Sequence, residues 1–175
     1  MRIDCDGVSI RSYSPNDLEA LVSYANNPRV AAHLRDRFPY PYTLEDGLEW
    51  LAAADQQDPE ANFVIATETE LIGTIGLNLG DDVYRHSGEV GYWIAEPFWG
   101  RGIATRTLKE FTEWGFAEFD LLRIFAHVFA DNVASARVLE KAGYELEGTM
   151  RQAVVKNGKV MDQLIYARLS PAGGH

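Results

Sequence analysis

The chain has 175 residues, 46% of them apolar and 24% charged, which is typical of one soluble globular domain. Its formal net charge is −10, which argues against nucleic acid as a partner, because nucleic acid is itself a polyanion. The same charge weakly favours cationic substrates such as amines.

The sequence also lacks the patterns of a membrane protein, a disulfide framework or a metal centre. No apolar stretch is long enough to span a bilayer and the first residues do not resemble a secretory leader, so we expect no membrane partner. The one cysteine, Cys5, allows no internal disulfide, and we therefore expect a reducing, cytoplasmic compartment. The four histidines show no ligand spacing, which predicts no metal site.

The first sixty residues are predicted to form one strand and several short helices. Apolar and polar side chains alternate over residues 8–13, as expected for a strand. Ser14 then caps a helix, and Pro28 starts a second, shorter one. Thr43 caps a third helix, with Asp46 at the capping-box position.

The loop of residues 35–43 contains two prolines and three aromatic side chains. The prolines prevent regular structure, and the aromatic rings would be poorly solvated if they were exposed. Either Phe38, Tyr40 and Tyr42 cover the core, or they form the wall of a substrate pocket, a common use of aromatic loops on a rigid scaffold.

From residue 62 onward, β-prone segments alternate with two segments of helical periodicity. Short polar turns join two pairs of these segments into hairpins, the second one at Asn157 and Gly158. Residues 170–175 are expected to be a frayed tail. The predicted elements are, in chain order, strands 62–67, 71–79 and 89–95, helix 103–118, strand 122–129, helix 131–141 and strands 144–154 and 160–169.

This order of elements implies an α/β (α+β) fold. We expect a mixed, mostly antiparallel central sheet of about seven strands, flanked by helices. The strand–helix–strand segment of residues 89–129 should form its central parallel β-α-β unit, with a right-handed connection. The chain is interpreted as a single domain of residues 1–175.

A glycine-rich turn links the strand of residues 89–95 to the helix that follows it. Gly100, Arg101 and Gly102 precede the helix, so free backbone N–H groups gather at the positive end of its dipole. Such a turn can bind a phosphate or pyrophosphate, with the glycines allowing close approach and Arg101 adding a cation. On its own, however, a Gly-x-Gly turn before a helix is a common and weak signal.

A second motif further along the chain makes the first one specific. Together the two resemble the GNAT superfamily of acyl-CoA-dependent N-acyltransferases, whose pyrophosphate loop reads Gln/Arg-x-x-Gly-x-Gly/Ala. Residues 99–104 are similar to it, with Trp99 at the usual Gln or Arg position. The family's downstream signature, Asn-x-x-Ser followed by a helix and Gly-Phe/Tyr, is matched by Asn132, Ser135, Gly143 and Tyr144. The resemblance covers nearly the whole chain and looks closest to the ribosomal-protein N-terminal acetyltransferases.

The resemblance implies acetyl-CoA as the cosubstrate, with residues 62–169 as the CoA-binding core and residues 1–60 on the substrate side. The pantetheine arm would pair with the main chain at Trp93, Ile94 and Ala95, and an N–H near Ile94 would polarise the thioester carbonyl. The residues implied to hold the pyrophosphate are Gly100, Arg101, Gly102, Ile103, Ala104 and Thr105.

The implied reaction is direct attack of a primary amine on the thioester. Glu89 is the candidate base acting through water, or it is a strand-end charge, and an amine that arrives neutral needs no base. Asn132 would hydrogen-bond the pantetheine or thiol end, or it only caps its helix. That helix has no Tyr, the acid of many superfamily members, so Ser135 is the available hydroxyl, or it only orients the helix.

The acceptor amine stays open between a protein N-terminus and a small molecule, as do the acyl chain length and the choice between monomer and homodimer. An alternative function is a CoA-binding sensor or catalytically silent module, which Trp99 and the missing tyrosine favour. Such a module predicts acetyl-CoA binding without thiol release. A Rossmann-type nucleotide protein would need a full glycine fingerprint and parallel repeats, and the predicted hairpins argue against it.

Overall fold

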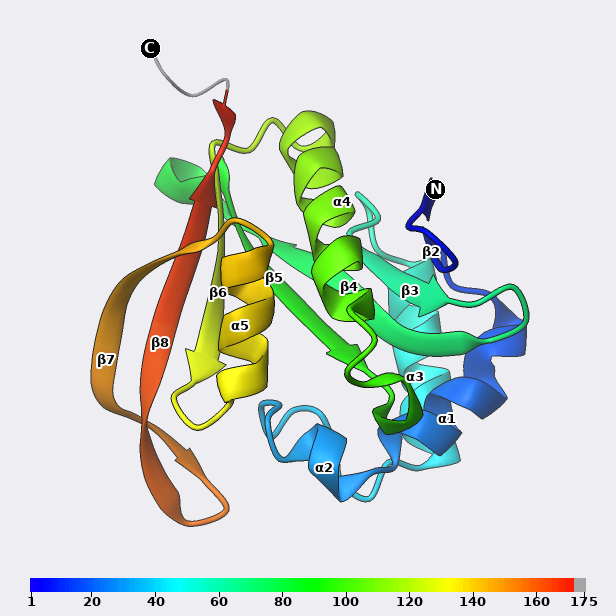
Figure 1. The fold of residues 1–175 in the computed structure, drawn as a ribbon. Coiled ribbons are helices and arrows are strands. Elements are labelled where there is room, and N and C mark those ends of the chain that lie inside the picture. The colour runs from blue at the N-terminus through cyan, green and yellow to red at the C-terminus, as the bar shows by residue number, and fades with distance from the viewer. Residues whose placement is uncertain (172–175) are drawn as a thin grey trace. The chain divides into compact units, whose positions relative to one another are not determined.

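The computed structural model describes residues 1–171, so the predicted tail lies, from residue 172 on, outside the described residues (Figure 1). Its strands form a mixed sheet in the order β1-β2-β3-β4-β5-β6-β8-β7. The pairing of β5 with β6 is parallel, and the other recorded pairings are antiparallel. The predicted α/β fold with a mostly antiparallel sheet is therefore confirmed, with eight strands where about seven were expected.

The chain packs as two compact units, Met1–Gly76 with Tyr92–Thr107, and Leu77–Gly91 with the segment from Leu108 onward. The first unit contains β1 (Arg2–Asp4), β2 (Ser9–Arg11), the 3₁₀ turn η1 (Pro15–Asp17), α1 (Leu18–Ala25), α2 (Pro28–Ala31), α3 (Leu44–Asp55), β3 (Asn62–Ala66), the first part of β4 (Leu71–Leu79), the end of β5 (Ser87–Ile94), η3 (Glu96–Phe98) and the start of α4 (Ile103–Glu118).

The extra strand is β1, which sequence reasoning missed. Asp6 and Gly7 have φ angles of +48° and +81°, and the Cys5 N–H donates to the Val8 carbonyl at 2.8 Å, so they form a two-residue hairpin turn. An Asp-Gly pair favours such a turn because both central residues need positive φ. The first strand predicted at residues 8–13 is thus β2, shorter than expected and paired with β1 through Asp4 and Ser9.

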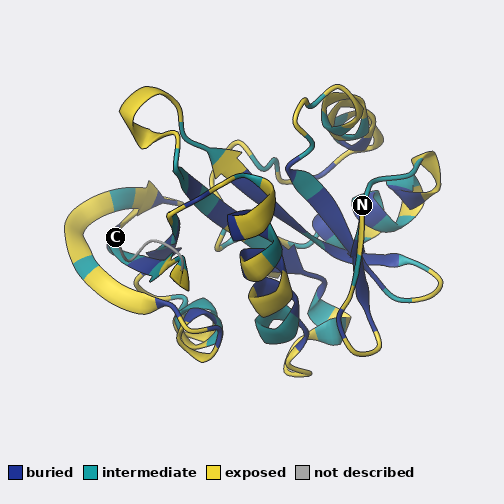
Figure 2. Cartoon of the chain, turned by 90° about the horizontal axis from the view of Figure 1, so that it is seen from above, coloured by how far each residue is buried: buried dark blue, intermediate teal, exposed yellow. Residues whose placement is uncertain are grey.

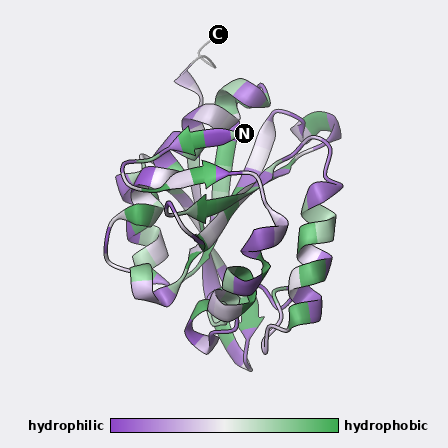
Figure 3. Cartoon of the chain, turned by 90° about the vertical axis from the view of Figure 1, so that its right-hand side faces the viewer, coloured by the Kyte–Doolittle hydropathy of each residue, from purple (hydrophilic) through white to green (hydrophobic). Residues whose placement is uncertain are grey.

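The predicted helix caps are present in the first unit. The Ser14 side chain accepts from the Asn16 N–H, and the Thr43 hydroxyl accepts from the Asp46 N–H at 3.2 Å. The Asp46 carboxylate accepts in return from the Thr43 N–H at 2.7 Å, which completes the capping box. The Thr43 hydroxyl also donates to this carboxylate, at 2.6 Å, and this bond, together with the one from the Thr43 N–H, lowers the pKa of Asp46 below its ordinary value. The helical ribbons alternate hydrophobic and hydrophilic bands, as expected of helices with one buried face (Figure 3).

The second unit is organised by parallel pairing of β5 with β6. It contains the rest of β4, β5 and α4, the 3₁₀ turn η2 (Asp82–Tyr84), β6 (Arg123–Phe129), α5 (Val133–Lys141), β7 (Glu145–Lys156) and β8 (Lys159–Leu169). Ser87 pairs with Arg123 and Glu89 with Phe125, which confirms the predicted parallel unit.

The last two strands form a long hairpin, orange to red in Figure 1. Its turn residues, Asn157 and Gly158, have φ angles of +49° and +76°, and the predicted Asn-Gly turn is therefore confirmed. Most of β7 is exposed, as the yellow ribbon in Figure 2 shows. Two register shifts, after Leu146 and after Met150, interrupt its pairing with β8. Such irregularities are a common protection of exposed edge strands against pairing with other chains.

Candidate active site

In the first unit, the end of β5 is hydrogen-bonded on both sides. The Ala95 N–H donates to the Ile72 carbonyl of β4 at 2.8 Å. Because neighbouring residues of a strand direct their backbone groups to opposite sides, the polar groups of Ile94 face away from β4. On that side the indole Nε1–H of Trp99 donates to the Ile94 carbonyl at 2.6 Å. Trp93, Ile94 and Ala95 are the predicted main-chain partners of the pantetheine arm, and among them Ile94 has its N–H directed away from β4.

Gly73 of β4 allows this arrangement. A Cβ atom at position 73 would overlap the carbonyl oxygen of Trp93 and press on the Cα of Ile94. Only a glycine lets the β4 backbone lie this close to the end of β5.

The glycine-rich turn has the backbone that the sequence predicts. Gly100 and Gly102 have φ angles of +74° and +71°, in the left-handed region that favours glycine. A Cβ atom at Gly100 would meet nothing within 4 Å, so the backbone conformation and not crowding requires glycine there. Helix α4 begins at Ile103, and the N–H groups of Ile103, Ala104 and Thr105 have no partner within the helix.

Two arginines flank this turn. The Arg101 guanidinium donates to the Pro97 carbonyl at 2.9 Å and lies 5.3 Å from the ring centroid of Phe98. Arg106 donates to the carbonyls of Arg101, at 2.9 Å, and Cys5, at 3.0 Å. Sequence reasoning singled out Arg101 and missed Arg106, although a basic side chain one turn after a glycine motif was a usable signal. The turn thus brings together N–H groups that have no partner within α4 and two positively charged side chains.

The aromatic loop divides between core and surface. Phe38 lies 5.2 Å from the ring of Tyr42 and 5.9 Å from that of Trp93 on β5. Tyr42 is buried, and burial, together with the Asp46 charge, raises the pKa of its hydroxyl to about 12. Tyr40 is exposed. Phe38 and Tyr42 thus cover the core, and Phe38 also contacts the end of β5.

In the second unit, Glu89 has a partner that sequence reasoning missed. Its Oε1 lies 2.8 Å from Nδ1 of His127 on β6, and both side chains are largely buried, with 18% and 21% exposed. The His127 ring also packs edge-on against Phe125, the residue that pairs with Glu89 across the two strands. The alternation of β6 was the available signal, because it places Phe125 and His127 on one face.

Asn132 and Ser135 meet at the start of α5. The Asn132 Oδ1 accepts from the Ser135 N–H at 3.2 Å, so Asn132 caps this helix. Its carboxamide N–H₂ is not needed for the cap and can donate elsewhere. The rest of the signature is structural, since Gly143 ends the helix with φ +87° and the buried Tyr144 hydroxyl lies 2.7 Å from Thr112 Oγ1.

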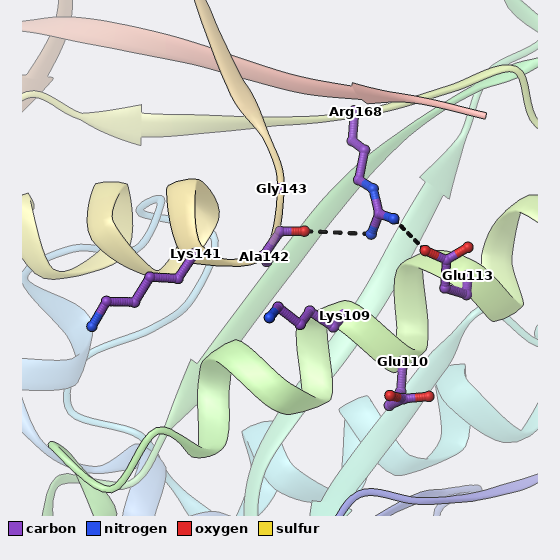
Figure 4. Close-up of a pocket in the computed structure, with 7 residues that line it drawn as sticks. All are labelled: Lys109, Glu110, Glu113, Lys141, Ala142, Gly143 and Arg168. Atoms are coloured by element: carbon purple, nitrogen blue, oxygen red, sulfur yellow. Dashed lines mark hydrogen bonds and ion pairs between the residues drawn. The ribbon is translucent and has the colours of Figure 1, made fainter. Parts of the chain in front are cut away.

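A shallow pocket of about 390 Å³ lies elsewhere in the second unit (Figure 4). Arg168 crosses it, donating to the Ala142 carbonyl at 3.3 Å and pairing with Glu113 of α4. None of the predicted site residues lines it. The lining residues are Lys109, Glu110, Glu113, Lys141, Ala142, Gly143 and Arg168.

The described part of the chain has neither a cluster of metal ligands nor a helix able to span a membrane. Within residues 1–171, no three His, Cys, Asp or Glu side chains are grouped so that they could hold a metal ion. In the same part of the chain, every helix is too short or too polar to cross a membrane.

Comparison with known proteins identifies the family. Residues 8–145 match the acetyltransferase (GNAT) domain family. The uncharacterized N-acetyltransferase YoaA of Bacillus subtilis (strain 168) is 29% identical over 183 residues, covering 97% of each chain. The ribosomal-protein-serine acetyltransferase of Escherichia coli (strain K12) is 33% identical over 107 residues, covering 61% of this chain and 59% of its own.

Solved structures share the fold. RimL, a ribosomal L7/L12 alpha-N-protein acetyltransferase solved in complex with coenzyme A, has a TM-score of 0.87 at 23% identity, covering 98% of this chain and 99% of its own. The chain belongs to the GNAT family of acetyltransferases, and it is an enzyme of the acetyl-CoA-dependent N-acyltransferase type.

Proposed function

We propose that this chain transfers the acetyl group of acetyl-CoA to a primary amine, either a protein N-terminus or a small molecule. The observation that carries the proposal is the turn at Gly100 and Gly102, both at positive φ and directly before the first turn of α4. A backbone of this shape can direct several N–H groups at one anion, and the space beside Gly100 leaves room for close approach.

These residues fit the pyrophosphate of acetyl-CoA. The N–H groups of residues 100–105 would supply most of the contacts, and Arg101 would supply a cation. Since backbone groups make these contacts, the replacement of Gln or Arg by Trp99 does not remove them. Nearer the thioester, the N–H of Ile94 would donate to the carbonyl oxygen as negative charge develops on it. The main-chain groups of Trp93 and Ala95 face β4, with the Ala95 N–H bonded to Ile72, so the pantetheine arm would pair with the strand through Ile94.

Glu89 is the proposed base, acting on the amine through water. The contact with His127 holds its carboxylate in one position, and a proton on Nδ1 toward Glu89 leaves Nε2 as an acceptor. Asn132 would donate its carboxamide N–H to the pantetheine or thiol end while its oxygen caps α5. The Ser135 hydroxyl is the proposed acid for the leaving thiolate.

The acceptor amine is argued from charge and from relatives. A net charge of −10 favours a cationic substrate. A relative named as a ribosomal-protein-serine acetyltransferase supports a protein N-terminus as one choice. Tyr40, the exposed ring of the aromatic loop, and Phe38, which contacts Trp93 at the end of β5, are proposed as the aromatic wall beside this amine, whereas the buried Tyr42 supports them from the core. A cytoplasmic location and a monomeric or homodimeric state remain predictions.

The experiment has two stages. The first is thermal melting with acetyl-CoA, CoA or NADH, where a ligand at 100 times its Kd should stabilise the fold by about 2.7 kcal/mol. We expect a shift with both CoA species and none with NADH. The second stage is thiol release over peptides with free N-termini, polyamines and amino sugars. Binding without release from any amine would favour the CoA-binding sensor, and no shift with CoA would contradict the site.

A further inference from the structure

We propose that Trp99 is a positioning residue that fixes the peptide group between Ile94 and Ala95, and thereby the direction of the Ile94 N–H. The inference rests on the proposed function, in which this N–H polarises the thioester carbonyl. It gives a role to the one residue of the turn that departs from the family's Gln or Arg.

The peptide group between Ile94 and Ala95 is hydrogen-bonded at both ends. Its N–H donates to the Ile72 carbonyl at 2.8 Å, and its oxygen accepts from the Trp99 indole at 2.6 Å. Because a peptide group is planar and rigid, two bonds on its opposite sides fix its rotation about the chain. The neighbouring peptide group, which carries the Ile94 N–H, is joined to it through a single α-carbon.

The two sides of this strand end are held differently. On one side β4 lies close, with Gly73 against the carbonyl of Trp93 and Ile72 bonded to Ala95. On the other side, the recorded bond to the Ile94 carbonyl comes from Trp99, a residue beyond the end of the strand. Loss of the indole N–H would therefore release the side of the strand to which the Ile94 N–H points.

Trp99 is itself held in place, although 40% of its surface is exposed. The Arg29 guanidinium of α2 lies 5.4 Å from the centroid of its ring. Arg29 pairs with Glu96, which also accepts from Asn27 Nδ2 at 2.7 Å. These contacts orient the indole, so its N–H bond is supported by a network. Gln and Arg, the family's residues at this position, also carry N–H donors, so Trp99 keeps the donor while changing the side chain.

The test compares three variants of the full chain. Trp99→Phe keeps an aromatic ring and removes the donor, whereas Trp99→Gln supplies a donor on the family's own side chain. Trp50→Phe is the matched control, because Trp50 lies on α3 with 39% of its surface exposed and loses the same N–H elsewhere. Thiol release gives kcat and the KM for acetyl-CoA, and NMR amide exchange reports on the Ala95 N–H.

In Trp99→Phe, kcat should fall about tenfold, equivalent to about 1.4 kcal/mol, while the KM for acetyl-CoA changes by less than about twofold. Exchange of the Ala95 amide should become faster. Trp99→Gln should restore most of the kcat and most of the protection of the Ala95 amide from exchange. Trp50→Phe should match the unsubstituted chain in both measurements. A role confined to packing of the loop would instead raise KM and would not be rescued by Gln.

Two results would overturn the inference while leaving the proposed function intact. One is an unchanged kcat with unchanged Ala95 exchange in Trp99→Phe, and the other is a rise in KM alone. If the unsubstituted chain released no thiol with any amine, the proposed function would fail. Ala95 exchange would then still decide whether Trp99 fixes the peptide group.

Discussion

Replacing Gly100 by alanine should weaken acetyl-CoA use far more than it weakens the fold. A matched control exists in Gly7, which turns the β1–β2 hairpin. The two glycines have φ angles of +74° and +81°, and at either position an added Cβ would meet nothing within 4 Å. Each substitution therefore adds only the strain of an L-residue in the left-handed region, about 1–2 kcal/mol. For a chain of this size each kcal/mol lowers Tm by about 2–4 °C.

The KM for acetyl-CoA should distinguish Gly100→Ala from Gly7→Ala. A hydrogen bond to a charged group contributes about 1.5–3 kcal/mol, so misdirecting one N–H of the turn should raise the KM for acetyl-CoA at least about tenfold in Gly100→Ala. Because the pyrophosphate lies far from the reacting atoms, kcat at saturating acetyl-CoA should change little. Gly7→Ala should leave both the KM for acetyl-CoA and kcat unchanged. Thiol release against acetyl-CoA concentration measures them, and melting without ligand verifies that the two variants lose similar stability.

Equal KM values in the two variants would refute this reasoning. A fall in kcat in Gly100→Ala at unchanged KM would also contradict it, because the turn would then act on the chemistry and not on binding.

Three further predictions follow from particular contacts. Glu89→Gln should lower kcat by about 10²-fold, within the range of general-base effects, and keep the melting shift with acetyl-CoA. His127→Gln should lower kcat by a smaller factor. Equal activity in the two variants and the unsubstituted chain would remove Glu89 as the base. Gly73→Ala should destabilise the fold by about 1–3 kcal/mol through overpacking, measured by urea unfolding, and a neutral effect would mean that β4 can shift. Hydrogen bonds from Thr43 lower the pKa of Asp46, so the contribution of the Asp46 carboxylate to stability should be present above the ordinary carboxyl pKa and be lost as pH falls through the lowered pKa. Asp46→Asn should flatten that part of the stability–pH curve, measured by urea unfolding at each pH. An unchanged curve would refute the assignment.

Local chemistry explains why much of the fold could be predicted. The Thr43–Asp46 capping box, the Asn157–Gly158 turn and the glycine turn before α4 each depend on residues close together in sequence. The β1–β2 hairpin was missed although its Asp-Gly turn is equally local, because a strand of three residues gives too short an alternation to recognise.

The site was harder to predict where it depends on contacts between distant segments. Nothing near Glu89 in sequence identifies His127, which lies on the neighbouring strand, two residues beyond Phe125, the residue that the parallel register pairs with Glu89. The bond from Trp99 to Ile94 spans only five residues, yet it requires the chain reversal at η3. Arg29 comes to Trp99 from α2, 70 positions earlier in the chain numbering, through tertiary packing alone.

The central claim is that this chain moves an acetyl group from acetyl-CoA to an amine. The most direct measurement is mass spectrometry of the amine panel after incubation with acetyl-CoA, with released thiol counted in the same samples. We predict at least one amine that gains one acetyl group for each thiol released, and an about 10²-fold fall in the rates of both in Glu89→Gln. A chain that binds acetyl-CoA but yields neither acetylated amine nor thiol would contradict it.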